Sequence, residues 1–198
     1  MCPGGFVVNA SSENKRLAIN GMSNNDRGSE NANSALIVTI TPSDFGDSPL
    51  DGIEFQRSLE EKAFELGNGL IPIQLFKDYK NNKVSKSLGN IKPIFKGNYT
   101  FSNINNVFPE YINESLKEAI MYFNNKIHGF SSDDAILAAV ESRTSSPIRI
   151  ERNEIGECNI KGIYPCGEGA GYAGGITSAA IDGIKVAEFI AQTYNNLV

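Results

Sequence analysis

Short apolar runs separated by polar stretches dominate the first 41 residues, a pattern typical of β-strands joined by loops. Residues 6–9 and 16–20 flank a polar turn at residues 11–15, which predicts a β-hairpin. After a long stretch rich in Asn, Ser and Gly, the mostly apolar and β-branched residues 34–41 predict a further strand. We therefore expect the beginning of the chain to be mainly β-structure.

Helical periodicity first appears after residue 50. Asp51 and Glu54 have the spacing of a capping box, and apolar residues then recur every three or four positions until Gly67. A second helix is predicted to follow Pro109, since proline suits a first helical turn, and to end at Gly129. Two amphipathic helices are therefore expected in the middle of the chain.

Shorter elements are predicted around these helices. Residues 71–76 form an apolar run that predicts a strand, whereas the Lys- and Asn-rich residues 77–86 predict a solvated loop. Residues 135–140 are again apolar, and residues 148–150 predict a strand after a Ser-Pro turn. Strands and helices therefore both contribute to the expected fold.

The last unit of the pattern is a predicted strand over residues 160–166, a glycine-rich loop over 167–175 and a helix over 176–192. Glycine lets the backbone approach a ligand closely, and the free N–H groups at a helix start favour negative charge. The loop matches the spacing G-x-G-x-x-G of the dinucleotide fingerprint. No strand with an acidic residue follows the helix, so we expect this loop to close a nucleotide-binding fold and not to open one.

The glycine loop is the strongest candidate site, and the alternative is tight helix–strand packing without a ligand. Inside it, the Glu168 carboxylate can accept hydrogen bonds from sugar or ribityl hydroxyl groups. The residues predicted to contact a cofactor are Gly167, Glu168, Gly169, Ala170, Gly171, Gly174, Gly175, Ile176 and Thr177.

A second candidate site lies at Arg143, Thr144 and Ser145. A guanidinium group beside hydroxyl groups can hold a carboxylate, a phosphate or a flavin carbonyl, which makes substrate or flavin contact the functional interpretation. The alternative is an ordinary polar turn between two strands. No general base stands out, so the pattern assigns no catalytic residue.

Composition narrows the classes of function. The 198 residues carry a formal net charge of −5, which gives no support for binding nucleic acid or anionic membranes. One histidine and three cysteines without CxxC spacing predict no metal site. Aliphatic runs are too short to span a membrane, and free cysteines without a visible signal peptide predict a cytoplasmic protein.

Several stretches carry a family resemblance. Residues 164–180 and 182–188 resemble the C-terminal flavin-binding segment of bacterial FAD-dependent proteins described as NAD(FAD)-utilizing dehydrogenases. Similar to the same family are residues 1–5, 31–36, 52–64 and 141–149. The resemblance covers most of the chain and is weakest over residues 77–105.

The resemblance implies a longer protein whose N-terminal portion carries the first Rossmann βαβ unit and is missing here. Residues 1–150 are then mainly an inserted, substrate-side lobe of mixed strands and helices. Residues 151–198 return to the FAD-binding domain. The expected fold class is α/β: an α+β inserted lobe plus the closing strand, loop and helix of a Rossmann-like FAD/NAD(P)-binding domain, an incomplete fold.

The resemblance also implies the function. The chain looks like the C-terminal part of a FAD-dependent, dehydrogenase-like oxidoreductase that binds FAD, acts on a small-molecule substrate and takes NAD(P)H as a candidate electron donor. Its main partner is then the missing N-terminal FAD-binding portion. We expect the isolated chain to be inactive and to self-associate through an exposed sheet edge. The alternative is a non-catalytic nucleotide- or anion-binding module, or a fragment that completes a partner's fold.

Overall fold

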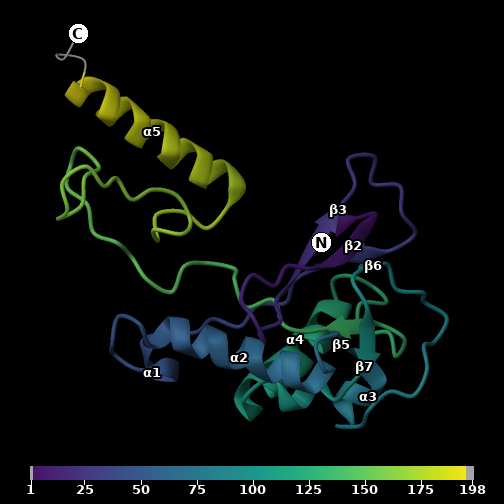
Figure 1. Cartoon of the computed structure of the whole chain (residues 1–198). Helices are drawn as coiled ribbons and strands as arrows, with labels where there is room; N and C mark the ends of the chain where they lie inside the picture. The colour runs from purple at the N-terminus through teal and green to yellow at the C-terminus, as the bar shows by residue number, and fades with distance from the viewer. Residues whose placement is uncertain (1, 195–198) are drawn as a thin grey trace. The chain divides into compact units, whose positions relative to one another are not determined.

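The computed structural model describes residues 2–194, and Figure 1 follows the chain from purple to yellow. The chain divides into two compact units. The first unit comprises Met1–Thr41 and Phe55–Ser142, and the second comprises Pro42–Glu54 and Arg143–Val198. Strands and helices both occur, so the predicted mixed α/β class is confirmed at this level.

The first unit contains eight strands and most of the helices among the described residues. In chain order they are β1 (Cys2–Pro3), β2 (Gly5–Asn9), β3 (Ile19–Ser23), β4 (Ala32–Asn33), β5 (Ile71–Leu75), α3 (Phe76–Lys80), β6 (Phe95–Lys96), β7 (Tyr99–Phe101), the 3₁₀ helix η1 (Ile104–Asn106), α4 (Glu110–Asn124) and β8 (Ile136–Ala138). The second unit contains α1 (Pro42–Phe45) and α5 (Ile176–Tyr194), and α2 (Asp51–Gly67) begins in the second unit and continues into the first.

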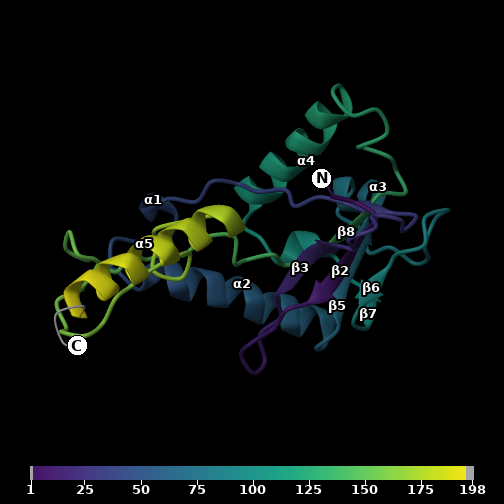
Figure 2. The same ribbon diagram turned by 90° about the horizontal axis from the view of Figure 1, so that it is seen from above.

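The predicted hairpin is present, but its second strand runs over Ile19–Ser23 and not over residues 16–20. Strand β2 pairs antiparallel with β3, with Phe6 opposite Met22 and Asn9 opposite Ile19, and it pairs parallel with β6 on its other edge. Figure 2 shows these strands side by side, as Figure 1 does. The side-chain amide of Asn33 donates hydrogen bonds to the carbonyl oxygens of Phe6 and Met22, at 2.9 and 3.0 Å, and so ties β2 to β3.

Strand β5 is the centre of the second three-stranded sheet, where it pairs parallel with β7 and antiparallel with β8. All five of its residues are buried, as the mostly apolar run predicts, and its one polar member, Gln74, donates hydrogen bonds from its side chain. The core beside it takes Leu59 and Ala63 from α2, at the predicted helical spacing, together with Ile120 from α4. Burying this one face explains why α2 and α4 form where periodicity predicts them.

Helix α2 begins as its sequence predicts, although the capping residues differ. Asp51 is the first helical residue, and its carboxylate accepts a hydrogen bond from the backbone N–H of Ser48 at 3.0 Å. The pair that resembles a capping box is therefore Ser48 with Asp51, three residues earlier than predicted. Helix α4 ends at Asn124, before the predicted Gly129, because the Asn124 side chain accepts hydrogen bonds from the N–H groups of Gly129 and Ser131.

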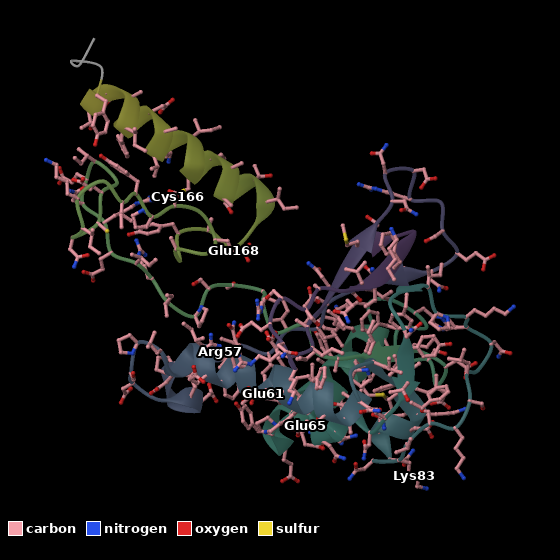
Figure 3. All side chains as sticks on the ribbon, in the orientation of Figure 1. Arg57, Glu61, Glu65, Lys83, Cys166 and Glu168 are labelled. Carbon is pink, nitrogen blue, oxygen red and sulfur yellow. The ribbon has the colours of Figure 1, made fainter. Side chains whose placement is uncertain are left out.

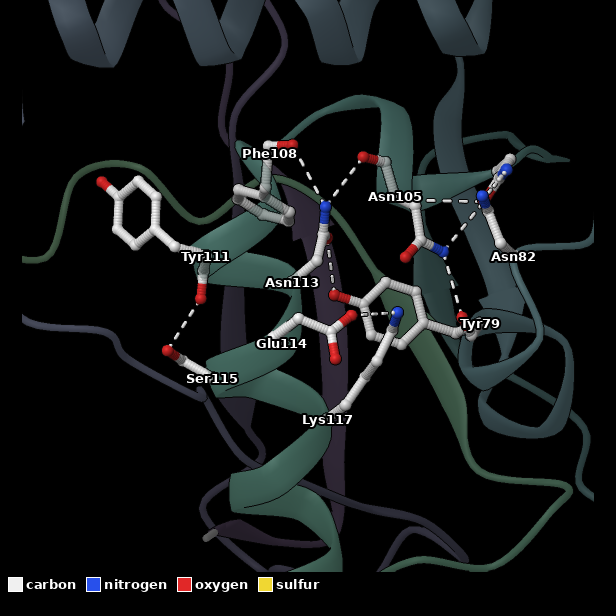
Figure 4. A network of polar contacts seen from close by, with 10 residues as sticks. Tyr79, Asn82, Asn105, Phe108, Tyr111, Asn113, Glu114, Ser115 and Lys117 are labelled. Carbon is white, nitrogen blue, oxygen red and sulfur yellow. Dashed lines mark hydrogen bonds and ion pairs between the residues drawn. The ribbon is translucent and has the colours of Figure 1, made fainter.

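The predicted solvated loop over residues 77–86 is wrong in its first half. Helix α3 occupies this position, and it buries Phe76 and Tyr79 on one face. The Tyr79 hydroxyl donates a hydrogen bond of 2.7 Å to the side chain of Asn113 in α4, which in turn donates to the carbonyl oxygen of Asn105 (Figure 4). Burial of the phenol raises the pKa of Tyr79 above its ordinary value.

Three predicted strands are absent from the described residues. Residues 34–41, 148–150 and 160–166 are neither strand nor helix. The last of these contains a turn instead, since the N–H of Cys158 donates to the carbonyl oxygen of Ile163 at 2.9 Å. Each stretch has strand-forming residues but meets no neighbouring strand among residues 2–194, and a strand is defined by that partner.

Candidate functional site

The glycine-rich loop of residues 167–175 closes on itself immediately before α5. The N–H of Gly171 donates to the carbonyl oxygen of Glu168 at 2.9 Å, and the N–H of Tyr172 donates to that of Gly167 at 3.0 Å. Gly167 and Gly171 both have positive φ angles, +72° and +82°, which glycine adopts without strain. Two of the five glycines therefore serve the turn itself.

Gly171 also permits a close approach between two segments. A Cβ atom at this position would lie 2.4 Å from the carbonyl oxygen of Ile148. The neighbouring Ile150 donates its N–H to the carbonyl oxygen of the buried Ala170 at 3.1 Å. Residues 148–150, predicted as a strand, thus lie against the loop. At Gly171, close packing within the protein is therefore sufficient to explain the glycine, without a ligand.

Arg152 and Asp182 hold the entrance of the loop to the first turns of α5. The Arg152 guanidinium donates two hydrogen bonds to the Asp182 carboxylate, at 2.9 and 2.6 Å, and a third to the carbonyl oxygen of Pro165 at 2.8 Å. The same carboxylate accepts the N–H of Gly167 at 2.9 Å. The guanidinium and then the Gly167 N–H hold the pKa of Asp182 down at about 2. We call Arg152 and Asp182 the loop clamp.

Tyr172 extends this anchoring on the other side of the loop. Its ring centroid lies 3.6 Å from the guanidinium carbon of Arg152 and 4.3 Å from that of Arg149. Its hydroxyl donates to the carbonyl oxygen of Ile150 at 3.1 Å. Cation–π contacts and this hydrogen bond therefore fix Tyr172 within the protein.

The remaining backbone of the loop is open. Among the described residues, the N–H groups of Gly169, Gly174, Ile176 and Thr177 have no hydrogen-bond acceptor, and all four residues are exposed. A Cβ atom at Gly169 would meet nothing within 4 Å. The donors of Gly174, Ile176 and Thr177 lie at or next to the N-terminus of α5, where the helix dipole adds positive potential, whereas Gly169 stands seven residues before it.

Glu168 and Gly175, two of the predicted cofactor contacts, differ in whether their polar groups are available to a ligand. The Glu168 side chain is exposed in the stretch that precedes α5, where Figure 3 labels it together with Cys166. Gly175 instead donates its N–H to the hydroxyl of Ser178 at 3.1 Å. The acceptor group of Glu168 is thus available to a ligand, whereas the N–H of Gly175 is engaged in capping α5.

The structure brings the second candidate segment next to the glycine loop. A Cβ atom at Gly174 would lie 3.8 Å from the hydroxyl oxygen of Ser145. The hydroxyl of Ser146 lies 3.1 Å from the carbonyl oxygen of Gly169. Arg143 is exposed and Thr144 is half-buried. The two stretches chosen from sequence are therefore neighbours, and their role in binding stays a prediction.

Sequence reasoning missed the loop clamp, whereas Ser146 lies in the polar segment that it had chosen. Asp182 carries the one signal that could have been used, because it is the only charged residue among the first nine residues of α5. A buried or half-buried carboxylate in such a place requires a partner. Residues 2–194 contain no cluster of three or more His, Cys, Asp or Glu side chains that could hold a metal ion. Their helices are all too short or too polar to cross a bilayer.

Comparisons with known proteins identify the family. A family model described as "FAD-dependent protein, C-terminal domain-like" matches residues 1–144, and the glycine loop lies beyond that match. A protein of Clostridium beijerinckii described as uncharacterized is 51% identical over 199 residues, which covers 98% of this chain. The chain spans 37% of the length of that relative. With most of its residues matched by the family model, the chain belongs to the family of FAD-dependent proteins, as a member of its C-terminal domain class.

Proposed function

We propose that this chain is the C-terminal part of a FAD-dependent, dehydrogenase-like oxidoreductase, to which it contributes a flavin-contacting loop and a substrate lobe. Membership of the family supports an association with FAD. The observation that carries the finer proposal is the row of free backbone N–H groups at Gly169, Gly174, Ile176 and Thr177. Such donors at a helix start suit the electron-rich atoms of a flavin ring or its ribityl chain.

The residues of the loop suit the flavin ring and ribityl chain of FAD, but they offer no site for its adenosine and pyrophosphate. Gly169 and Gly174 have no side chain to hinder approach, and Glu168 offers an exposed carboxylate to the ribityl hydroxyl groups. The N–H of Gly167 is already bonded to Asp182, and Gly171 packs against Ile148. The adenosine and pyrophosphate are proposed to be held by a Rossmann-like N-terminal portion of the full-length protein.

The flavin supplies the two-electron chemistry when it is bound, with NAD(P)H as the proposed electron donor. The chain's own residues bind and orient. Arg143, Thr144 and Ser145 are proposed to hold a polar group of the substrate or of the flavin, and Ser145 lies beside Gly174 of the loop. We propose that residues 1–150 mainly form the substrate-side lobe and that residues 151–198 complete the FAD-binding domain.

Exposed apolar side chains on α5 suggest that residues 151–198 pack against another part of a longer protein. Ile176, Ile181 and Ile184 are 93%, 49% and 60% exposed, whereas Val186 is buried. Covering three isoleucines would contribute several kcal/mol, at about 1.5–3 kcal/mol for each fully buried side chain. The matched relative is much longer than this chain. We propose that the FAD-binding portion of a full-length protein covers these side chains, and that the isolated chain self-associates through an exposed sheet edge. Free thiols at Cys158 and Cys166 suit a cytoplasmic location.

Flavin content tests the proposal. A full-length protein that contains this segment is expected to show the visible absorption bands of an oxidised flavin, and the 198-residue chain is expected to bind added FAD weakly, measured by quenching of flavin fluorescence. A full-length protein that stays colourless after incubation with FAD would refute the flavoprotein assignment. Tight FAD binding by the isolated chain would instead favour a self-sufficient nucleotide-binding module.

A further inference from the structure

One stretch of the first unit has a charge opposite to that of the rest of the protein. Residues 77–96 contain six lysines and a single acidic residue, Asp78, which gives this stretch a formal charge of +5. Because the whole chain carries −5, the other 178 residues together carry −10. Asp133 and Asp134, which pair with Lys80 and Lys77, offset part of this excess, and the remaining positive charge attracts anions to the stretch.

Three of these lysines line a hollow in the surface. The hollow has a volume of about 530 Å³ and is lined by Lys77, Asp78, Lys83, Val84, Lys86 and Ser87. Figure 3 labels Lys83 at the margin of the first unit. The hollow is broadly open to solvent, so a small anion bound there stays partly hydrated.

The backbone that carries these lysines is held by buried groups. The hydroxyl of the buried Ser85 donates to the Asp78 carboxylate at 2.6 Å and accepts the N–H of Leu75 at 2.8 Å. The side chain of Gln74, also buried, donates to the carbonyl oxygen of Lys83 at 2.7 Å. Lys83 and Lys86 therefore flank a fixed point of the structure, which lowers the entropic cost of binding a ligand between them.

Two of the lysines lining the hollow have charges that no acidic partner neutralises. Lys83 and Lys86 form no ion pair with any residue from 2 to 194, whereas Lys77 lies 4.0 Å from an Asp134 carboxylate oxygen. Outside the lining, Lys80 is paired with Asp133 at 3.0 Å. Unpaired ammonium groups on a held loop provide charge for an incoming anion.

We infer that this hollow binds a small molecule that bears a phosphate or diphosphate group. Ammonium groups act as point charges and suit the spread charge of phosphate, and the Ser87 hydroxyl is a further donor. Val84, which is half exposed, offers apolar contact to the remainder of such a molecule. The Asp78 carboxylate, which also lines the hollow, accepts a hydrogen bond from the Ser85 hydroxyl. Because this carboxylate repels an anion, the anionic group of the ligand is expected to lie nearer Lys83 and Lys86. The inference does not depend on flavin binding.

Titration of the isotope-labelled 198-residue chain with pyrophosphate at low salt tests this inference. We expect saturable shifts of the backbone amide resonances of residues 83–87. The affinity of the Lys83→Gln/Lys86→Gln variant is expected to be about tenfold weaker, because two exposed positive charges that face the anion are removed. The matched control is Lys62→Gln/Lys126→Gln, which removes the same charge from exposed lysines outside the hollow. Its affinity is expected to stay within about twofold.

Three outcomes would overturn the inference. Shifts that do not saturate would mean that no defined site exists, and an equal loss of affinity in the control variant would assign the binding to net charge alone. Tighter binding of an acidic peptide than of pyrophosphate would assign the hollow to a protein partner. Unchanged amide resonances away from the substitutions show that both variants keep the fold, so a loss of binding reports on the site.

Discussion

The loop clamp gives the most direct test of how the glycine loop is held. In the variant Asp182→Asn the carboxylate that receives two hydrogen bonds from Arg152 and one from Gly167 becomes neutral. The side chains of Arg152 and Asp182 are only 15% and 13% exposed, so solvent replaces these interactions poorly. We expect the second unit to lose stability and the loop to loosen.

The magnitude follows from the pKa of Asp182. A carboxyl group held at about 2 is stabilised in its charged form relative to an ordinary aspartate. At 1.36 kcal/mol per pH unit, a depression of nearly two units is worth about 2 kcal/mol. As a control, Asp133→Asn breaks the ion pair with Lys80, whose members are 68% and 34% exposed, and should cost less than about 1 kcal/mol.

The pH dependence has a definite sign. Because folding lowers the pKa of Asp182, its contribution is fully present above the unfolded value of about 3.9 and is lost as the pH falls through the folded value of about 2. The difference between wild type and Asp182→Asn should therefore be constant near neutral pH and shrink between about pH 4 and pH 2. No other titrating group is changed, so the difference isolates this carboxylate.

Hydrogen exchange and urea unfolding at several pH values measure these effects. The amide of Gly167 should exchange faster in Asp182→Asn, since it loses a charged acceptor, whereas Asp133→Asn should leave it unchanged. An equal loss of stability in both variants would refute the reasoning. So would a wild-type advantage over Asp182→Asn that persists undiminished at pH 2.

Two further changes test the core and the packing of the loop. Tyr79→Phe should lower the free energy of unfolding in urea by about 1–2 kcal/mol, because the Asn113 side-chain oxygen loses its buried donor. Ultraviolet titration of the wild type should show that Tyr79 ionises at higher pH than an ordinary tyrosine, since burial raises its pKa. Gly171→Ala should lower the free energy of unfolding by about 1–3 kcal/mol, because φ is positive at this position and the added methyl group would collide with the carbonyl group of Ile148. A melting temperature equal to that of the wild type would contradict this packing.

Local patterns predicted those elements whose stability is local or depends on one buried face. Helices α2 and α5 and strand β5 occur close to their predicted bounds, because helical spacing, a glycine at the end of α2 and a mostly apolar run each favour one conformation. Tyr79 was missed because it stands among lysines and asparagines, and a single helical turn with two aromatic residues gives too short a period to recognise.

The three missing strands show where local patterns end. Residues 34–41, 148–150 and 160–166 have strand-forming residues, but strand formation requires a hydrogen-bonding neighbour that the sequence of one segment does not specify. Residues 148–150 find the glycine loop as their neighbour. The loop clamp was missed for the same reason, since its two residues lie 30 positions apart and meet only through the tertiary fold.

Four of the five glycines of the loop form two pairs with different surroundings, and the difference bears on the cofactor proposal. Gly167 and Gly171 form the turn, and a side chain at Gly171 would collide with the neighbouring backbone. A side chain would fit at Gly169 and Gly174, because an added Cβ atom would meet nothing within 4 Å at Gly169 and would make only an ordinary contact at Gly174. Packing therefore explains the first pair and leaves the second pair unexplained. A close ligand accounts for glycine at positions where the protein itself would accept a side chain.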